Sequence, residues 1–268
     1  MRIVRAVAAG LLLTMLLAAL LTGFIATAPH EKQFREEPNA QPSWLHPLGT
    51  DELGRDALSR LLYGSRVSLL LAPAAALLAT LIAALVGGVA GYLGGQWQRV
   101  ALGATDIALS LPWLFLLLTV RAILPLNVSP MTSVVITFAL LGLLGWAASA
   151  RVVCAGARAL RDSDFVLQAH AFGCPGWRLL IRQVLPNLKP VLFAQFWISI
   201  PAFILTEANL GVLGLGVAEP LPSWGNLLRG LENWPAVQSN PWRLAPLVLL
   251  VIGVSCFQLI LPREDFTS

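Results

Sequence analysis

The sequence predicts an all-α membrane protein with six transmembrane helices and one polar loop on the cytoplasmic side. Three observations predict this fold class. The 268-residue chain is 57% hydrophobic and 12% charged, whereas a soluble domain is about 45–50% apolar and about 25% charged. Charged residues bracket six apolar segments, each long enough for the roughly 20 residues that cross a bilayer. A polar stretch at 151–189 interrupts the apolar pattern.

The first apolar segment begins the chain. Arg2 and Arg5 precede an uncharged run from Ala6 to His30, which is longer than the apolar region of about 7–15 residues in a cleaved signal peptide. Residues 1–28 are therefore predicted to form a signal-anchor helix that stays in the membrane, with its span at Val7–Ala28.

Five further spans follow within a core predicted at 67–262, and residues 263–268 form a short tail. Charged residues set their limits: Arg66–Arg99, Arg99–Arg121, Arg121–Arg151, Lys189–Glu219 and Arg243–Arg263. Lysine and arginine are concentrated in the loop after the fourth span, and cytoplasmic loops carry an excess of these residues. The loop and both chain termini are therefore predicted to be cytoplasmic, and residues 29–66 to lie on the opposite side.

Residues 29–66 combine a charged turn, "GTDELGRD", with an amphipathic segment. Leu58, Leu61 and Leu62 fall on one side of that segment if it is helical. Two interpretations stay open: an interfacial helix that orients the second span, or a surface that contacts a binding protein or a substrate.

Three glycines recur at intervals of four residues in the second span, at Gly87, Gly91 and Gly95. Small residues at this spacing let helix backbones approach closely in lipid. Packing within the chain and contact across a subunit interface both explain the series.

The loop 151–189 contains "DFVLQAHAFGCPGWRLLIRQVLPN" and is predicted to form two short helices joined at Gly173. Residues Asp162–Asp164 can cap the first helix, and glycine tolerates the left-handed conformation that ends a helix. Pro175 suits the first turn of the second helix. That helix is predicted to have an apolar face, Trp177, Leu180, Ile181 and Val184, and a basic ridge, Arg178 and Arg182.

This loop resembles the E-A-A loop of bacterial ABC-importer permeases. The matching residues are Ala169, Gly173, Val184, Leu185 and Pro186, while Leu167 and Gln168 stand where the family has glutamate and its first alanine. The resemblance implies a coupling helix that docks in a groove of an ATPase subunit. The expected docking residues are Leu167, Gln168, Ala169, His170, Gly173, Trp177, Arg178 and Pro186.

Two other stretches are similar to the second-subunit permeases of dipeptide, oligopeptide and nickel importers: "HPLGTDELGRDALSRLLYGSRVSLLLA" and "TEANLGVLGLGVAEPLPSWGNLL". The resemblance covers roughly residues 46 to 260, whereas the final "LPREDFTS" departs from the family's tail. It implies a type I importer fold in a bacterial inner membrane, with residues 29–66 in the periplasm. The implied partners are a second homologous permease, two ATPases that bind ATP and Mg²⁺, and a periplasmic or lipid-anchored substrate-binding protein. Peptide is preferred over nickel, because no Met-, His- or Cys-rich stretch suggests a metal path.

Asp106 and Glu207 are the two charges predicted inside the spans. A charge at the centre of a span costs about 2.5–3.5 kcal/mol on insertion scales, so such residues face protein or water. The resembling family also has an aspartate six residues before a proline, as Asp106 and Pro112 are here, and a glutamate at the position of Glu207. A pathway or gating role and a hydrogen-bonded packing role stay open for both.

The sequence argues against several other functions. A phosphate loop is excluded, because neither Lys32 nor Lys189 follows a glycine. His30-Glu31 lacks the second histidine of a zinc-protease motif, since Phe34 stands there. The three cysteines lack metal-site spacing and are predicted to be free thiols. No catalytic residue, metal site, bound cofactor or nucleic-acid surface is therefore expected. A secondary transporter usually shows inverted repeats or broken helices; this reading and an intramembrane enzyme are less favoured than a permease subunit.

Overall fold

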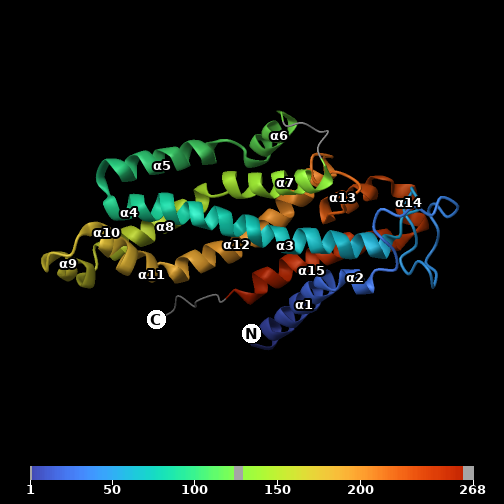
Figure 1. Cartoon of the computed structure of the whole chain (residues 1–268), viewed down its shortest axis with the longest axis horizontal. Coiled ribbons are helices and arrows are strands. Elements are labelled where there is room, and N and C mark those ends of the chain that lie inside the picture. Colours follow the sequence, from blue (N-terminus) through green and yellow to red (C-terminus); the bar gives the residue numbers. More distant parts are fainter. Residues whose placement is uncertain (1, 124–128, 262–268) are drawn as a thin grey trace. The chain divides into compact units, whose positions relative to one another are not determined.

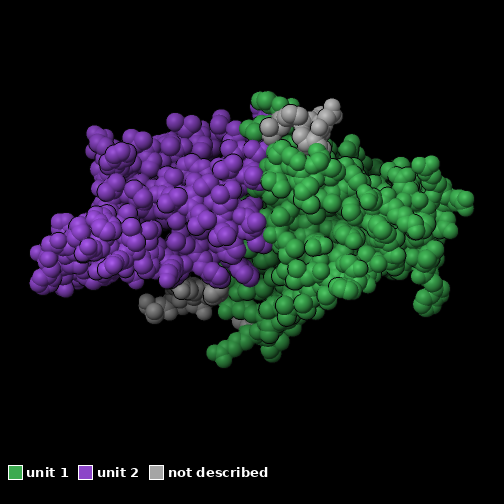
Figure 2. Space-filling model, in the orientation of Figure 1, with its two compact units in different colours: residues 1–72, 120–138, 200–268 green, residues 73–119, 139–199 purple. Residues whose placement is uncertain are grey.

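The computed structural model describes residues 2–123 and 129–261, which divide into two compact units (Figure 2). Unit 1 comprises Met1–Ala72, Val120–Phe138 and Ile200–Ser268, and unit 2 comprises Pro73–Thr119 and Ala139–Ser199. Helices account for the secondary structure of the described residues, where the β-pairing consists of two isolated bridges, Gln33 with Arg55 and Thr50 with Asp56. The all-α prediction is confirmed, and the predicted tail 263–268 lies outside the described residues.

Five helical stretches are long and apolar enough to cross a membrane, and a bent pair makes up to six. The five are Arg2–Leu20, Ala57–Leu93, Pro130–Arg161, Lys189–Val212 and Pro241–Ile260. The pair consists of α5 (Gly95–Ser110) and α6 (Trp113–Ile123), bent by 81°. The six predicted spans are confirmed if this pair counts as one.

The bend in the third span was not predicted, and it has a local cause. Leu111 is extended, with φ −80° and ψ 131°, because the ring of Pro112 disfavours a helical conformation in the residue before it. Proline also lacks the amide hydrogen that would continue the helix. The span predicted between Arg99 and Arg121 is therefore present as a bent pair of helices and not as one continuous helix.

Two other predicted span limits are wrong for a shared reason. The second span begins with α3 at Ala57 rather than at Arg66, and the fourth continues through α8 to Arg161 rather than ending at Arg151. Long arginine side chains can direct their charge toward water or a partner while the stem stays in an apolar setting. The amphipathic segment after Asp56 is accordingly continuous with the second span, and Leu61 is buried in it.

Unit 1 is built around the terminal helices and the first part of α3 (Ala57–Ala83). The helices α1 (Arg2–Leu20) and α15 (Ala245–Ile260) run side by side (Figure 1). Trp224 is fully buried against Gly253, where an added Cβ would also contact Met15. The remaining elements of the unit are α2 (Thr22–Ile25), α13 (Trp224–Arg229), η3 (Gly230–Glu232), α14 (Trp234–Ser239) and η4 (Pro241–Leu244), with parts of α6, of α7 (Pro130–Leu144) and of α12 (Lys189–Val212).

Unit 2 is organised around α8 (Ala147–Arg161). It is contacted by η1 (Ala84–Gly88), α4 (Val89–Leu93) and α5 (Figure 1). After α8 come α9 (Asp164–Ala171), α10 (Gly176–Leu179), the π-helical turn η2 (Leu180–Val184) and α11 (Leu185–Asn187).

The glycine series of the second span is explained by packing within unit 2. A Cβ at Gly87 would overlap the carbonyl of Ala150, and one at Gly91 would overlap the carbonyl of Cys154 and lie 2.8 Å from Cβ of Ala157. Gly95 does not take part in this packing: nothing lies within 4 Å of an added Cβ, and its φ of +54° belongs to the reversal between α4 and α5. The prediction holds for two of the three glycines.

Candidate functional site: the loop after α8 and the polar groups of the spans

The loop after α8 folds as the sequence predicts, with two short helices hinged at a glycine. Gly173 has φ +81°, and nothing lies within 4 Å of an added Cβ. The amides of Phe172, Gly173 and Cys174 donate to carbonyls in the last turn of α9, at 3.0, 2.9 and 3.1 Å. A residue in the left-handed conformation allows this closing pattern. Ser163 occupies the N-cap position but makes no side-chain cap bond.

The apolar face predicted for the second helix is wrong. Leu179 and Val184 are fully buried, whereas Trp177 and Ile181 are 64% and 56% exposed. The π-helical turn from Leu180 to Val184 adds a residue to the helical turn, so the α-helical spacing assumed in the prediction does not hold there.

A buried cluster attaches the two short helices to α8. Val166 of α9, Val184 of η2 and Leu188 pack with residues of α8 in a single core. The other buried members of this cluster are Ala83, Ala150, Val153 and Ala157. The two short helices are therefore joined to α8 by packed side chains and not only by the connecting chain.

The outer surface of the loop carries large apolar side chains, which we term the knob. Its exposed members are Phe165, Leu167, Phe172, Trp177 and Ile181. The guanidinium of Arg178 lies 5.5 Å from the ring centroid of Trp177. Of the predicted docking residues, Leu167, Gln168, His170, Gly173, Trp177 and Arg178 are exposed, and Ala169 and Pro186 are partly buried. Exposed apolar side chains beside basic ones are typical of surfaces that bind another protein.

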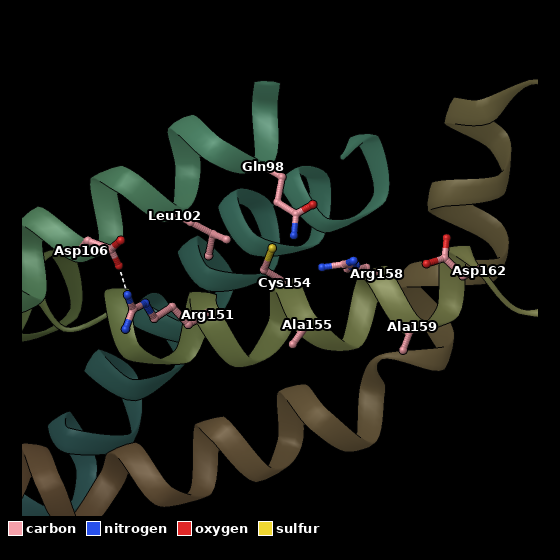
Figure 3. A pocket seen from close by; sticks show the side chains of 9 residues that line it. All are labelled: Gln98, Leu102, Asp106, Arg151, Cys154, Ala155, Arg158, Ala159 and Asp162. Atoms are coloured by element: carbon pink, nitrogen blue, oxygen red, sulfur yellow. Dashed lines mark ion pairs between the residues drawn. The ribbon is translucent and has the colours of Figure 1, made fainter. Parts of the chain in front are cut away.

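Asp106 lies on α5 and faces Arg151 of α8, with which it forms an ion pair (Figure 3). Their side chains are 55% and 47% exposed. Both line a cavity of about 560 Å³ in unit 2, together with Gln98, Leu102, Cys154, Ala155, Arg158, Ala159 and Asp162. The sequence singled out Asp106 but missed Arg151, because that arginine was taken as a span boundary.

Glu207 has a different setting. It is fully buried in α12 of unit 1, and the hydroxyl of Ser68 donates to its Oε2 at 3.3 Å. The same hydroxyl accepts from the amide of Trp224 at 3.1 Å, and the indole of Trp224 donates to Ser65 at 2.9 Å. Of the two interpretations left open for Glu207, this arrangement favours a hydrogen-bonded packing role.

A charged network at the start of α3 was not predicted as such. Arg55 Nη1 lies 2.6 Å from Oε2 of Glu219, and Arg60 Nη2 lies 2.9 Å from Oε1 of the same carboxylate. Arg55 Nε also pairs with Asp51 at 2.7 Å. Burial alone would raise the pKa of Glu219, but the hydrogen bonds and charges of Arg60 and Arg55 lower it overall. These contacts hold the segment before α13 against the start of α3.

A second buried group in the same region centres on Asp56. Its carboxylate accepts from the hydroxyl of Thr27 at 2.7 Å, lies 2.9 Å from Nδ1 of His46, and accepts from the amide of Ser59 at 2.8 Å. Burial opposes its ionisation, yet these hydrogen bonds lower the pKa of Asp56. The group therefore ties the segment after α1 to the first turn of α3.

Arg121 is a further residue that the sequence reading missed. It is 3% exposed, and it donates to the carbonyl of Leu215 at 3.1 Å and to Ser133 Oγ at 2.6 Å. The prediction used Arg121 as the limit between two spans.

The cysteine prediction is confirmed, since Cys154, Cys174 and Cys256 are all free. Within the residues that the structure describes, no group of three or more histidine, cysteine or acidic side chains is placed to hold a metal ion.

Comparison with known proteins identifies the family. The model of the inner membrane component of binding-protein-dependent transport systems matches residues 57–261. The chain is 35% identical to the di/tripeptide transport system permease protein DppC of Pseudomonas aeruginosa, over 84% of this chain and 75% of that protein. It is 32% identical to the dipeptide transport system permease protein DppC of Bacillus subtilis, over 87% and 70% of the two chains. It is 29% identical to the oligopeptide transport system permease protein OppC of Haemophilus influenzae, over 92% and 80%.

The matched region includes every described span except α1, together with the loop after α8. The resemblance seen in the sequence is thereby confirmed, and the chain is a multi-pass membrane protein that works with other transporter subunits. The chain belongs to the family of binding-protein-dependent transport system inner membrane components.

Proposed function

We propose that this chain is a translocation subunit of an ATP-driven importer for dipeptides or oligopeptides. The names of its relatives, which are permeases for dipeptides, di/tripeptides and oligopeptides, support peptide as the substrate class. The proposed partners are a second homologous permease, two ATPase subunits that bind ATP and Mg²⁺, and a substrate-binding protein outside the membrane. The chain itself performs no catalysis and binds no cofactor, and its loop after α8 and both termini face the cytoplasm.

The observation that carries this proposal is the attachment of the knob to α8. Val166 and Val184 are buried against α8, while Leu167, Trp177 and Ile181 remain exposed for a partner. When the ATPases close around ATP, their motion displaces the knob and, through the buried cluster, α8. Arg151 moves with α8, so its pairing with Asp106 changes as the pathway alternates between its two sides. ATP drives the change because the ATPases bind it more tightly in one of the two states.

Substitution at the hinge tests the coupling. We expect Gly173→Asp to leave the chain in the membrane and bound to its ATPases, but to abolish the stimulation of ATP hydrolysis by substrate. Gly173→Asn is the matched control, because asparagine has the same size and also tolerates positive φ but carries no charge. It should retain most of the stimulation.

The readouts are co-purification of the ATPases and ATP hydrolysis by the reconstituted transporter with and without the loaded binding protein. Unchanged stimulation in Gly173→Asp would remove the coupling role from this loop. Peptide as substrate is tested separately, by uptake of radiolabelled trialanine into cells with and without the chain.

A further inference from the structure

The cavity between α5 and α8 has walls that are incompatible with lipid. Gln98, Asp106, Arg151 and Arg158 line it, and Asp106 and Arg151 remain about half exposed although both lie in membrane-spanning helices. Charged side chains in a span face protein or water, because exposure to the hydrocarbon is costly. This face of unit 2 is therefore covered by water or by another protein, and not by lipid.

Two aspartates and two arginines line the cavity, and a third arginine, Arg161, pairs with one of the aspartates from outside it, which leaves one lining cation over. Asp106 is neutralised by Arg151, and Asp162 by Arg161, whose Nε lies 2.8 Å from Oδ1. The side chain of Arg158 lines the cavity and, among the described residues, makes neither an ion pair nor a hydrogen bond, although its charge acts on Asp162. Asp162 is its charged neighbour at that end, and Arg161 already occupies the Asp162 carboxylate.

Gln98 lies at the same end of the cavity as Arg158. Figure 3 shows the amide of Gln98, on α5, and the guanidinium of Arg158, on α8, extending into the space between the two helices. A guanidinium offers a planar set of donors that matches a carboxylate or phosphate, and an amide NH₂ adds a further donor. Two donor groups from different helices are thus available to one oxyanion.

The rest of the cavity suits a ligand of variable shape. Its volume of about 560 Å³ lies within the range of roughly 300–1,000 Å³ for small-molecule sites. Leu102, Ala155 and Ala159 form apolar walls, and the two alanines leave room beside α8. A free peptide always has a carboxylate at its C-terminus, whereas its side chains differ.

We propose that Arg158 and Gln98 form an oxyanion site that binds the C-terminal carboxylate of a peptide on its way through the transporter. The peptide as ligand rests on the proposed function. The same chemistry would also accept the phosphate of an anionic lipid, so the test has to separate these two sources.

A reporter cysteine measures both the access of water to the cavity and the electrostatic potential inside it. The three native cysteines of the chain are replaced and Ala155→Cys is introduced. This variant is assembled into the complete transporter and reconstituted in nanodiscs of zwitterionic lipid. Its reaction rates with an anionic and with a cationic methanethiosulfonate are compared. We expect the anionic-to-cationic rate ratio to fall about tenfold when Arg158→Gln is added, as for the loss of a unit charge some 6 Å away in water.

Two control variants separate the site from general charge and from misfolding. Arg158→Lys keeps the charge and should retain most of the rate ratio. Arg99→Gln removes an exposed arginine next to Gln98 in sequence that does not line the cavity, and should leave the ratio unchanged. No reaction with either reagent, or an equal fall in Arg99→Gln and Arg158→Gln, overturns the proposal.

Protection identifies the ligand. Trialanine should slow modification of Ala155→Cys, trialanine amide should not, and Arg158→Gln should abolish the difference. The measurement is repeated in nanodiscs that contain anionic lipid. Protection by the anionic lipid without protection by trialanine, or equal protection by the peptide and its amide, overturns the carboxylate site. Uptake of trialanine by cells is measured in parallel: if the unmodified transporter imports no peptide, the proposed function fails, whatever the protection experiment shows.

Discussion

The two units of this permease use polar side chains in opposite ways. In unit 1 buried polar groups are held by partners from distant parts of the chain: Arg60, 4% exposed, binds Glu219, and the fully buried Glu207 accepts from the hydroxyl of Ser68, which itself accepts from the amide of Trp224. In unit 2 the pair of Asp106 and Arg151 borders a cavity and stays half exposed. The difference teaches that a charge in an apolar chain marks either a fixed junction, where at least one partner is buried, or an accessible surface, where both partners are about half exposed.

The largest expected effect tests the junction in unit 1. Trp224→Ala removes a fully buried indole and its hydrogen bond to Ser65, which should destabilise the protein by about 3–5 kcal/mol. Trp44→Ala is the control, because Trp44 is fully exposed. Thermal unfolding of the detergent-solubilised transporter measures both. Similar melting temperatures for the two variants would contradict the assignment of Trp224 as a packing centre.

The next prediction concerns the close helix packing of unit 2. Gly91→Ala places a methyl group against the carbonyl of Cys154 and 2.8 Å from Cβ of Ala157, and overpacking of this kind costs roughly 1–3 kcal/mol. Gly103→Ala should be neutral or slightly stabilising, because nothing lies within 4 Å of the added methyl group. The same thermal assay applies, and equal effects of the two changes would rule out tight packing of α4 on α8.

The ion pair in the cavity is expected to affect transport more than stability. Asp106→Arg or Arg151→Asp places like charges opposite each other, and should lower peptide uptake about tenfold, within the coupling of 0.5–3 kcal/mol typical of residues in contact. The double variant with both changes restores opposite charges and should recover most of the uptake. The melting temperature should change little, because a half-exposed pair contributes no more than about 1 kcal/mol. Failure of the double variant to recover uptake would show that the pair is not a functional contact.

The smallest effect is a pH dependence in unit 1. The pKa of Glu219 is lowered in the folded protein, so its contribution to stability is present above the unfolded pKa of about 4.3. That contribution is lost as the pH falls through the folded pKa. Glu219→Gln should therefore flatten the decline of unfolding free energy between about pH 5 and pH 3. The lowered pKa of Asp56 acts in the same direction, so part of the decline should remain. An unchanged slope would show that Arg55 and Arg60 do not stabilise the ionised Glu219.

The sequence predicted the structure correctly where a feature depends on one continuous stretch of the chain. The apolar runs predicted the spans, and Gly173 predicted the hinge, since a positive φ there depends on the residue itself. The predictions failed where an arginine was taken as the end of a span. Arg151 lies inside a span, and the side chain of Arg121 is buried, where it donates to the carbonyl of Leu215. The predicted apolar face of the helix after Gly173 also failed. A π-helical turn there changes the directions of the side chains from those of a regular α-helix, and Ile181 is exposed.

The sequence by itself determined that the chain is helical, crosses the membrane several times, and carries a hinged polar loop. These properties follow from hydropathy and local backbone preference, which each segment carries with it. Only the tertiary structure decided which charges meet: Arg60 and Glu219 are 159 residues apart in the chain, and Asp106 finds Arg151 because α5 packs on α8. Hydropathy measures how apolar each segment is, whereas a pairing depends on which helices touch. Close packing at Gly87 and Gly91 determines one such contact, that of η1 and α4 with α8.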